Sequence, residues 1–190
     1  MPRLFIGIKI TTAKSFENIY IELKKKLSYS NIKWVDPENF HLTLKFLGEV
    51  DKSLISRIIK VLDPIAGKNP QFCLESKELG FFGRSGNPRI IWYGFEQEDI
   101  LLNLQSSIET SLKNLGFAKE KKGYSPHLTL GRVKKFVSQE NLKESLAELK
   151  PANEKYNVTR FSLVESILRQ KGPEYRIIKD FCLKETKEQN

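Results

Sequence analysis

Apolar residues recur along this chain with two periods, one typical of helices and one typical of strands. In residues 15–27, for example, Phe16, Tyr20 and Leu23 recur every three or four positions, which predicts a helix with one buried face. Helices are predicted over 15–27, 51–65, 99–115 and 138–149. Alternating or short continuous apolar runs predict strands over 4–10, 32–35, 41–47, 71–79, 89–95, 127–133, 158–168 and 175–183.

Local signals place the ends of several of these elements. Ser15 is a candidate N-cap for the first helix, and Gly116 is well placed to end the third. The segment 80–88, which contains three glycines and a proline, is expected to be a loop, and 123–126 a turn. The last residues, 184–190, are expected to form a polar tail.

The order of the elements repeats. Each half of the chain places a long helix before a strand that begins His-Leu-Thr-Leu and another helix after it, which indicates a degenerate internal duplication. No linker rich in Gly, Ser or Pro separates the halves. We therefore expect residues 1–190 to form a single α+β domain, in which two lobes pack as one unit around a cleft.

Composition narrows the class of protein. Of the 190 residues, 39% are apolar and 29% charged, which is typical of a folded globular chain. Since no apolar run approaches the length of a membrane span, we expect no membrane association, and the apolar start is better explained by a buried strand than by a signal peptide. The net charge of +9 favours contact with phosphates, although it is weak evidence by itself.

The two cysteines, Cys73 and Cys182, each lie between apolar neighbours in a strand-like run. We expect both to be buried free thiols in a reducing cytoplasm, and a single disulfide is the alternative. The chain has no CxxC motif and no cluster of Cys and His, so the sequence predicts no zinc site.

The two histidines of the chain, His41 and His127, open identical tetrapeptides in the segments FHLTLKFLG and PHLTLGRV. The chain contains only seven threonines, so finding one two places after both histidines has a chance of about one in 700. A single HLTL would carry little information. Its repetition is what makes the signal specific.

In a strand, side chains alternate between the two faces, so the histidine and threonine of each motif share one face and the two leucines share the other. If the two strands meet across a cleft, two imidazoles and two hydroxyls face each other. One imidazole can take a proton from an attacking water while the other donates one to a leaving oxygen, since histidine titrates near neutrality. The hydroxyls can donate to the oxygens of a phosphate, where negative charge develops.

Two other interpretations compete with this one. A lone buried histidine is most often hydrogen-bonded and inert, but the doubled motif argues against that role. Two histidines without a paired carboxylate make a poor metal site, although Glu49 follows the first motif closely. We therefore expect neither a metal nor another cofactor.

The paired motifs resemble those of the 2H phosphoesterase superfamily, in which two HxTx motifs each lie on a strand. The segments NIKWVDPENFHLTLKFLGEV, NPRIIWYGF, YSPHLTLGRVK and FSLVESILRQKGPEYRII are similar to the bacterial and archaeal branch once named 2′-5′ RNA ligases. The resemblance covers nearly the whole chain. It implies two pseudo-symmetric lobes whose antiparallel sheets surround a central cleft, with the helices outside.

The resemblance also implies an activity, the metal-independent opening of RNA 2′,3′-cyclic phosphate ends to 2′-phosphates, with reversible 2′-5′ ligation as the reverse reaction. It implies His41 as proton donor, His127 as proton acceptor, and Thr43 and Thr129 as phosphate ligands. RNA is then the only partner expected, and the protein would act as a cytoplasmic monomer. Alternatives are a 2′-5′ oligonucleotide hydrolase, a 3′ RNA exonuclease or a non-catalytic RNA-binding module.

Two cations near the motifs are further candidates for substrate binding. Lys45 shares the face of His41 and Thr43 if the strand is regular, and it would then contact RNA phosphate. Arg132 would lie on the face opposite Thr129, but the resembling family often has arginine there. A phosphate contact or a place at the rim of the cleft is therefore one interpretation, and a surface arginine is the other.

Aromatic residues beside the motifs could stack on a nucleobase, although core packing is the plainer interpretation for each. They are Phe40, Phe81, Phe82 and Tyr124. Trp34 and Trp92 are expected in the core. Arg84 and Arg89 flank the glycine-containing segment and could border the cleft.

Overall fold

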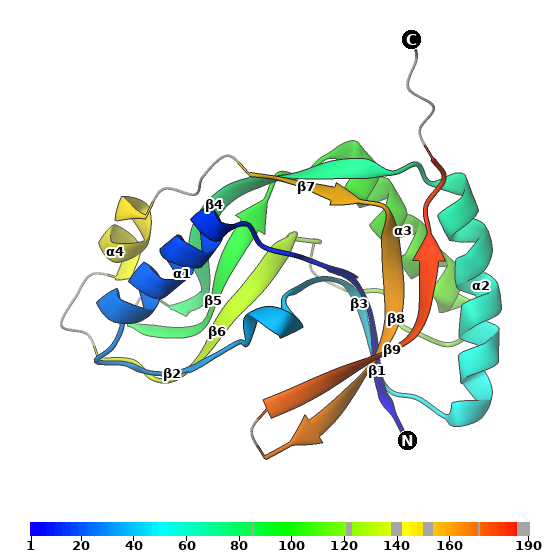
Figure 1. Ribbon diagram of the computed structural model, residues 1–190. Helices are drawn as coiled ribbons and strands as arrows, with labels where there is room; N and C mark the ends of the chain where they lie inside the picture. The colour runs from blue at the N-terminus through cyan, green and yellow to red at the C-terminus, as the bar shows by residue number, and fades with distance from the viewer. Residues whose placement is uncertain (85, 121–122, 138–141, 150–153, 171, 186–190) are drawn as a thin grey trace, which may run out of the picture.

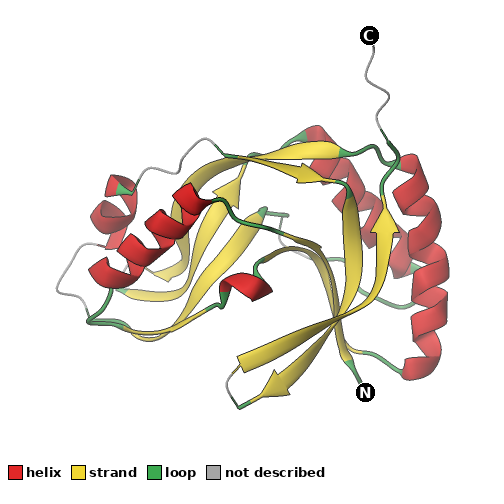
Figure 2. Cartoon of the chain, viewed as in Figure 1, coloured by secondary structure: helices red, strands yellow, loops and turns green. Residues whose placement is uncertain are grey.

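The computed structural model describes residues 1–84, 86–120, 123–137, 142–149, 154–170 and 172–185. Within these ranges, nine strands form one sheet in the order β7-β4-β5-β6-β3-β1-β8-β9, with β2 paired to β6. Every pairing between these strands is antiparallel. Figure 1 shows that the sheet bends into two halves, and Figure 2 shows that the α-helices lie outside both.

The first lobe carries the first motif. Its strands are β1 (Arg3–Lys9), β3 (His41–Glu49), β8 (Arg160–Arg169) and β9 (Gly172–Cys182). Two helices cover its outer face, and a 3-10 helix leads into each of the elements β3 and α2. These are α2 (Ile55–Lys68), α3 (Asp99–Lys113), η1 (Pro37–Asn39) and η2 (Lys52–Leu54).

The second lobe carries the second motif. Its strands are β2 (Asn31–Trp34), β4 (Phe72–Arg84), β5 (Asn87–Phe95), β6 (His127–Lys135) and β7 (Lys155–Val158). Its helices are α1 (Lys14–Lys26) and α4 (Leu142–Glu148). The predicted class, the two lobes and the external helices are confirmed.

The two halves of the chain exchange helices. Helix α1 precedes β3 in the sequence but packs beside α4 on the second lobe, whereas α3 precedes β6 but packs against β3 and α2 on the first lobe. Neither lobe is therefore a continuous stretch of chain. A single residue pair, Leu42 with Leu128, joins β3 to β6 and so joins the two halves of the sheet.

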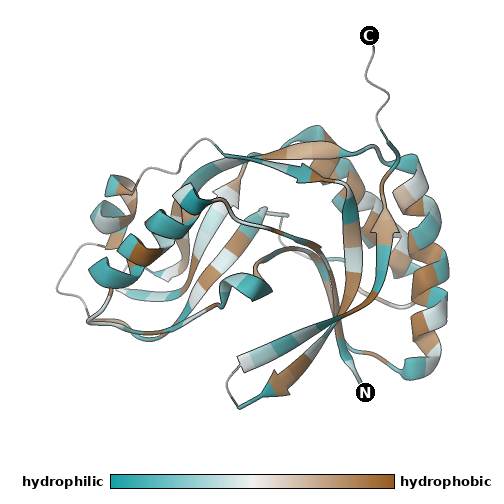
Figure 3. Ribbon diagram, viewed as in Figure 1, coloured by the Kyte–Doolittle hydropathy of each residue, from teal (hydrophilic) through white to brown (hydrophobic). Residues whose placement is uncertain are grey.

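Alternation of apolar and polar residues along the strands explains how the sheet separates core from cleft (Figure 3). In β3 and β6 the motif leucines are buried, at no more than 2% exposure, while His and Thr are half-buried on the other face. The leucines belong to one apolar core that includes residues of both lobes. Each motif thus fixes its strand in the core and presents its polar pair to the cleft.

Several predicted boundaries were wrong. Residues 80–84 continue β4 and 87–88 begin β5, so these parts of the expected loop 80–88 belong to paired strands, and residue 85 lies outside the described residues. Position 80 is occupied by glycine because a Cβ there would come within 2.3 Å of the Trp92 ring, so this glycine does not mark a turn. The single strand predicted over 158–168 is divided between β7 and β8, and β9 begins earlier than expected.

Helix ends also differ from the predictions. Ser15 does not cap α1, whose N-cap is Ala13, and its hydroxyl bonds Glu154 instead. The helix predicted over 51–65 is divided between η2, which Asp51 caps, and α2. Gly116, with φ of 92°, follows α3 as predicted. Helix α4 confirms part of 138–149, while the predicted start at 138–141 and the tail beyond 185 lie outside the described residues.

Both cysteines are free thiols, as predicted, but the burial expected for them was wrong. Cys182 is exposed, and Cys73 is half-buried with its thiol directed to Asn157 Oδ1 at 3.3 Å. Alternation along the strands explains this, because their neighbours Leu74 and Phe181 occupy the core face. Among the described residues, no helix is long and apolar enough to span a membrane.

Candidate active site

The two HLTL motifs meet at the joint between the lobes. Each histidine is the first residue of its strand, and the Leu42–Leu128 pair follows both of them by one residue. Continuing this antiparallel register by one position places His41 across from Thr129 and Thr43 across from His127, on the cleft face. In a regular pair the two histidines would then lie on a diagonal of roughly 7–8 Å, which leaves room for one phosphate between them.

Both imidazoles are held in the same way. Nδ1 of His41 lies 2.7 Å from the backbone oxygen of Asn39, and Nδ1 of His127 lies 2.8 Å from that of Ser125. A carbonyl only accepts, so each Nδ1 carries a proton and donates it. Nε2 of each ring is thereby left for the substrate, as an acceptor in the neutral ring and as a donor in the imidazolium.

A β-bulge at the same place in each motif changes which side chains reach the cleft. In β3 the register with β1 shifts between Thr43 and Lys45, and in β6 the register with β5 shifts between Thr129 and Gly131. The extra residue in each strand is the second leucine of the motif. After it the alternation reverses, so Phe46 and Arg132, each five residues after its histidine, join the cleft face.

The bulges correct both cation predictions. Lys45 does not share the His41 face. It is 3% exposed, points toward α3, and pairs through Nζ with Glu109 at 2.8 Å and with the backbone oxygen of Ala118 at 2.8 Å. Arg132, expected on the face away from Thr129, instead lines the cleft beside it. A regular strand would have given the opposite result for each residue.

Side chains at equivalent positions of two helices lie beside the backbone carbonyls of the two bulges. The carbonyl of Leu44 accepts from Gln105 Nε2 at 3.5 Å, and the carbonyl of Leu130 accepts from Val35 N at 2.9 Å. The Tyr20 hydroxyl lies 3.5 Å from the Leu130 carbonyl and donates its proton to the Val35 carbonyl at 2.6 Å. Gln105 and Tyr20 each stand six residues into the helix that packs behind the motif, α3 or α1. The carbonyls freed by the extra leucines are thus satisfied in both lobes.

Two aromatic rings surround each histidine. The ring centroids of Phe5 and Tyr175 lie 4.7 and 5.0 Å from that of His41. Phe82 and Trp92 lie 4.8 and 6.5 Å from His127. These rings enclose the imidazoles on their apolar sides, so each histidine is reached mainly from the cleft.

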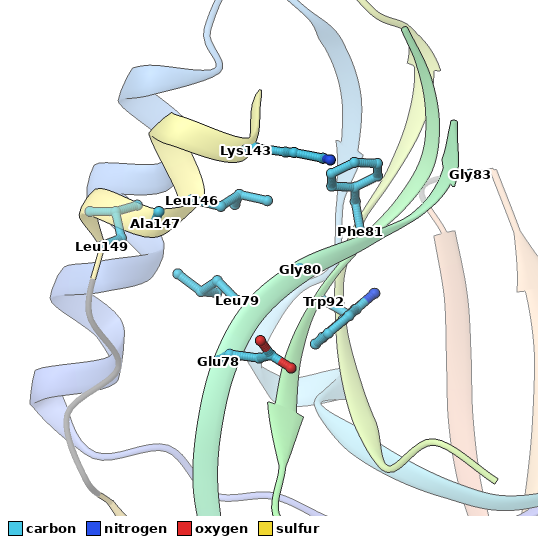
Figure 4. Close-up of a pocket in the computed structure, with 10 residues that line it drawn as sticks. All are labelled: Glu78, Leu79, Gly80, Phe81, Gly83, Trp92, Lys143, Leu146, Ala147 and Leu149. Atoms are coloured by element: carbon cyan, nitrogen blue, oxygen red, sulfur yellow. The ribbon is translucent and has the colours of Figure 1, made fainter. Parts of the chain in front are cut away.

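Trp92 can lie flat on the sheet because two glycines lie beneath it. A Cβ on Gly80 would meet the indole at 2.3 Å, and one on Gly94 would meet it at 2.8 Å. In Figure 4, Leu79 points from β4 toward α4, where a hollow of about 560 Å³ lies, and Trp92 borders the same hollow beside Gly80. Trp92 therefore supports His127 rather than filling the core as predicted.

Electrostatics lowers the pKa of both histidines. Burial is the largest cause for each, and it is partly opposed by the hydrogen bond to the Asn39 or Ser125 carbonyl. The positive charge of Arg132 lowers the pKa of both rings further, and His127 adds a small lowering to His41. Arg132 is therefore close enough to act on both imidazoles. An anion bound between the two histidines would raise their pKa and so oppose the effect of Arg132.

The motifs open into a cleft of about 1630 Å³. His41, Thr43, His127, Thr129 and Arg132 all line it, so the structure brings five of the six predicted site residues together and leaves out only Lys45. Seven Lys or Arg residues and three acidic residues line the cleft. No group of three or more potential metal-binding side chains occurs in the described part of the chain.

The other sequence candidates divide between core and cleft. Phe40 is buried in the core, and Phe81 lines the hollow beside α4. Tyr124 donates from its hydroxyl to the backbone oxygen of Thr43 at 3.1 Å, and burial raises its pKa. Trp34, expected in the core, packs against it and also borders the cleft, while Arg84 and Arg89 are exposed and do not line it.

Sequence reasoning missed three aromatic residues. Phe5 and Tyr175 reach His41 from β1 and β9, and no local signal connects those strands with the motif. Phe46 was missed because only the bulge turns it into the cleft. Aligning the two motif segments with each other would have identified Phe46, because Phe46 and Arg132 each follow their histidine by five residues.

Comparisons with known proteins show what the whole chain is similar to. The RNA 2′,3′-cyclic phosphodiesterase of Archaeoglobus fulgidus is 34% identical over 185 residues, covering 94% of this chain and 99% of that protein. The protein of the same name from Thermotoga maritima is 36% identical over 178 residues, covering 93% and 92%.

Solved structures share the fold. The protein TT0787 of Thermus thermophilus superposes with a TM-score of 0.79 at 24% identity, covering 96% of this chain and 98% of that one. E. coli LigT in its apo form gives 0.73 at 24% identity, with the same coverage. The model of the "LigT like Phosphoesterase" family matches residues 6–92 and 95–175. The chain therefore belongs to the LigT-like phosphoesterase family.

Proposed function

We propose that this protein hydrolyses RNA 2′,3′-cyclic phosphodiester ends to 2′-phosphomonoesters without a metal ion. The observation that carries the proposal is the matched pair of imidazoles, each with Nδ1 bound to a carbonyl and Nε2 left for substrate, on one face of one cleft. The names of the relatives at 34% and 36% identity support the choice of substrate.

In the proposed reaction, His127 Nε2 takes a proton from water as the water oxygen attacks phosphorus. The bond from phosphorus to O3′ breaks on the opposite side, and His41 Nε2 gives its proton to O3′. The product keeps the phosphate on O2′. One proton enters the site with water and one leaves on the 3′-hydroxyl, so the two histidines exchange protonation states and return to the start by proton exchange with solvent.

Assigning the acid to His41 follows the family resemblance, and its surroundings are consistent with that role. Burial, Arg132 and His127 all lower its pKa, which makes the imidazolium a stronger acid toward the departing oxygen. Its protonated form would be restored when the negatively charged substrate binds beside it. His127 then serves as the neutral base.

Thr43, Thr129 and Arg132 are proposed to hold the phosphate. If the register of the Leu42–Leu128 pair continues by one residue, each hydroxyl lies across the strand joint from the opposite histidine and can donate to a non-bridging oxygen. Arg132 adds a fixed positive charge that acts on both rings. All three side chains line the cleft.

The test is hydrolysis of a short RNA that ends in a 2′,3′-cyclic phosphate, with a chelator present. Wild type should give a 2′-phosphate end, and His41→Ala and His127→Ala should each lower kcat by about 10²- to 10⁴-fold while remaining folded by circular dichroism. Lys60→Gln, an exposed change on α2, serves as the matched control. Full activity in either histidine variant would disprove the two-histidine mechanism.

Other products would redirect the assignment. A 3′-phosphate end would keep the reaction class but reverse the leaving oxygen. Cleavage of internal 2′-5′ linkages, or stepwise loss of 3′ nucleotides, would favour the alternative hydrolases. Binding of the RNA without turnover would favour the non-catalytic module.

We also propose that the chain acts as a single-domain monomer in the cytoplasm. The exchanged helices and the shared core support one folding unit, since neither lobe is continuous in sequence. The two free thiols are compatible with a reducing compartment. Sedimentation at micromolar concentration tests the oligomeric state.

A further inference from the structure

The chain reaches His127 through a connection that crosses from one lobe to the other. Helix α3 lies on the first lobe and β6 on the second, and the described part of the connection between them is residues 114–120 and 123–126 (Figure 1). Near its end, Ser125 supplies the carbonyl that accepts from His127 Nδ1 at 2.8 Å. The position of this connection therefore determines how the imidazole of His127 is held.

A side chain continues the junction of the two lobes beyond its single backbone pair. Among the described residues, β3 and β6 pair only at Leu42 and Leu128. Thr43 is the next residue of β3, and its carbonyl accepts from the Tyr124 hydroxyl at 3.1 Å. The residue just before Ser125 is thus bonded to the motif strand of the opposite lobe.

Two further contacts hold the same connection. From the first lobe, Lys45 Nζ donates to the Ala118 carbonyl at 2.8 Å. From the second lobe, the backbone N–H of Phe95 donates to the Pro126 carbonyl at 3.2 Å. The two neighbours of Ser125 in the chain are therefore bonded to opposite lobes, which fixes the peptide group between them.

Tyr124 is placed for positioning and not for contact with substrate. Its ring packs against the core, and it is not among the residues that line the cleft. Burial raises the pKa of its hydroxyl, so the hydroxyl remains a hydrogen-bond donor at the pH values where histidine titrates. Removing that hydroxyl would therefore leave the lining of the cleft unchanged.

His41 is held in a different way. Its Nδ1 donates to the Asn39 carbonyl, and Asn39 Nδ2 in turn donates to the Pro173 carbonyl at 3.3 Å. Pro173 belongs to β9, which is in the same lobe as His41. One imidazole is thus fixed from within its own lobe, and the other is fixed partly from the opposite lobe.

We propose that Tyr124 is a positioning residue for His127, whose bond to Thr43 fixes the Ser125 carbonyl and so keeps the proton of the neutral imidazole on Nδ1. This inference rests on the proposed function, in which Nε2 of His127 accepts a proton from water. A neutral ring that carries its proton on Nε2 cannot act as that base. Loss of the Tyr124 hydroxyl therefore lowers the fraction of competent enzyme without changing any contact to substrate.

The tautomer of each histidine can be measured directly, because the chain has only two. Nitrogen-15 NMR of the imidazoles reports it, and a spectrum of His41→Gln assigns the signals of His127. At a pH where both rings are neutral, wild type should carry both protons on Nδ1. Tyr124→Phe, which keeps the ring, should move His127 toward the Nε2–H form and leave His41 unchanged. With RNA that ends in a 2′,3′-cyclic phosphate, it should lower kcat about 3- to 10-fold with KM unchanged.

Tyr29→Phe is the matched control, because Tyr29 is 71% exposed and does not line the cleft. It should change neither the tautomers nor the rate. An unchanged His127 tautomer in Tyr124→Phe would overturn the proposal whatever the rate. Equal changes in both histidines would also overturn it, because the hydroxyl would then support the fold in general.

The NMR measurement distinguishes failure of this inference from failure of the proposed function. If wild type does not hydrolyse the RNA, the proposed reaction is wrong, and the His127 tautomer still decides whether Tyr124 positions the ring. If wild type is active and Tyr124→Phe changes the tautomer but not kcat, the positioning role in the reaction is overturned.

Discussion

The two motif strands share a sequence and a backbone, yet they present different chemistry. In β3 and β6 alike, Nδ1 of the histidine is held by a carbonyl two residues back and the second leucine forms a bulge. The carbonyl of that leucine accepts from the Gln105 side chain in β3 and from the Val35 amide in β6. The difference begins after the bulge. Lys45 and Phe46 stand in one strand where Gly131 and Arg132 stand in the other.

The neighbouring strand β2 explains the first part of this difference. It pairs with β6, and a Cβ on Gly131 would lie 2.7 Å from Ile32 Cγ2 and 3.0 Å from Trp34 Cε3. In the described structure no strand takes that place beside β3, so Lys45 has room to extend to Glu109. Identical motifs thus build one symmetric reaction centre, and unequal neighbours make its two sides unequal.

The largest expected effect concerns the buried ion pair of Lys45 and Glu109, which connects β3 to α3 in the first lobe. Lys45→Met leaves Glu109, whose side chain is 7% exposed, without its partner in the core. We expect the free energy of unfolding to fall by about 3–5 kcal/mol in urea titrations. Lys45→Met combined with Glu109→Leu should recover most of that loss. Equal stability of the single variant and wild type would contradict the role of this ion pair.

The next largest effect is expected from replacing Arg132, whose counterpart in β3 is the uncharged Phe46. Arg132→Gln should lower kcat/KM about 100-fold, because it removes positive charge from the developing phosphorane. It should also raise the pKa of both histidines, since Arg132 lowers them in the wild type, and so shift the kcat/KM optimum to higher pH. Arg132→Lys, which keeps the charge, should keep the wild-type optimum. A large loss of rate without that shift in the pH optimum would show that Arg132 does not act on the pKa of the histidines.

The threonines test whether the centre itself is symmetric. Thr43→Val and Thr129→Val keep the shape but remove one hydroxyl each, so kcat should fall about 10-fold in either. The register around Leu42 and Leu128 predicts losses of similar size. Serine at either position should restore most of the rate. A loss confined to one threonine would show that the phosphate lies closer to one lobe.

The smallest expected effect concerns pH. In the free enzyme the base must be neutral and the acid protonated, and both pKa values lie below the ordinary value of about 6.5. The kcat/KM profile should therefore be a bell centred on the acidic side of 6.5. Bound phosphate favours both imidazolium forms, so the kcat profile should be centred at higher pH. Coinciding centres would contradict a phosphate bound between the rings.

The sequence was sufficient for the parts of the site that depend on local pattern. Period-two alternation placed histidine and threonine on one face and leucines on the other, and the core burial of Leu42 and Leu128 agrees. The same rule misplaced Lys45 and Arg132, because a bulge reverses the alternation and has no signature in HLTL. Local reasoning cannot locate a bulge that neighbouring strands and helices determine.

Longer-range features were beyond the sequence for a different reason. Phe5 and Tyr175 reach His41 through strand pairings between distant segments. Gly80 suggested a loop, yet it stands within β4 to admit the Trp92 ring. The exchange of α1 and α3 between lobes also follows from packing and not from the order of elements.

The single backbone pair between Leu42 and Leu128 has a mechanical consequence. Each histidine lies next to that pair, so the distance between proton donor and proton acceptor, roughly 7–8 Å along the diagonal of a regular pair, is governed by the register of two neighbouring strands. The width of the catalytic gap is therefore a property of one strand-to-strand contact, and any substitution that alters the register of Leu42 and Leu128 alters the distance between proton donor and proton acceptor.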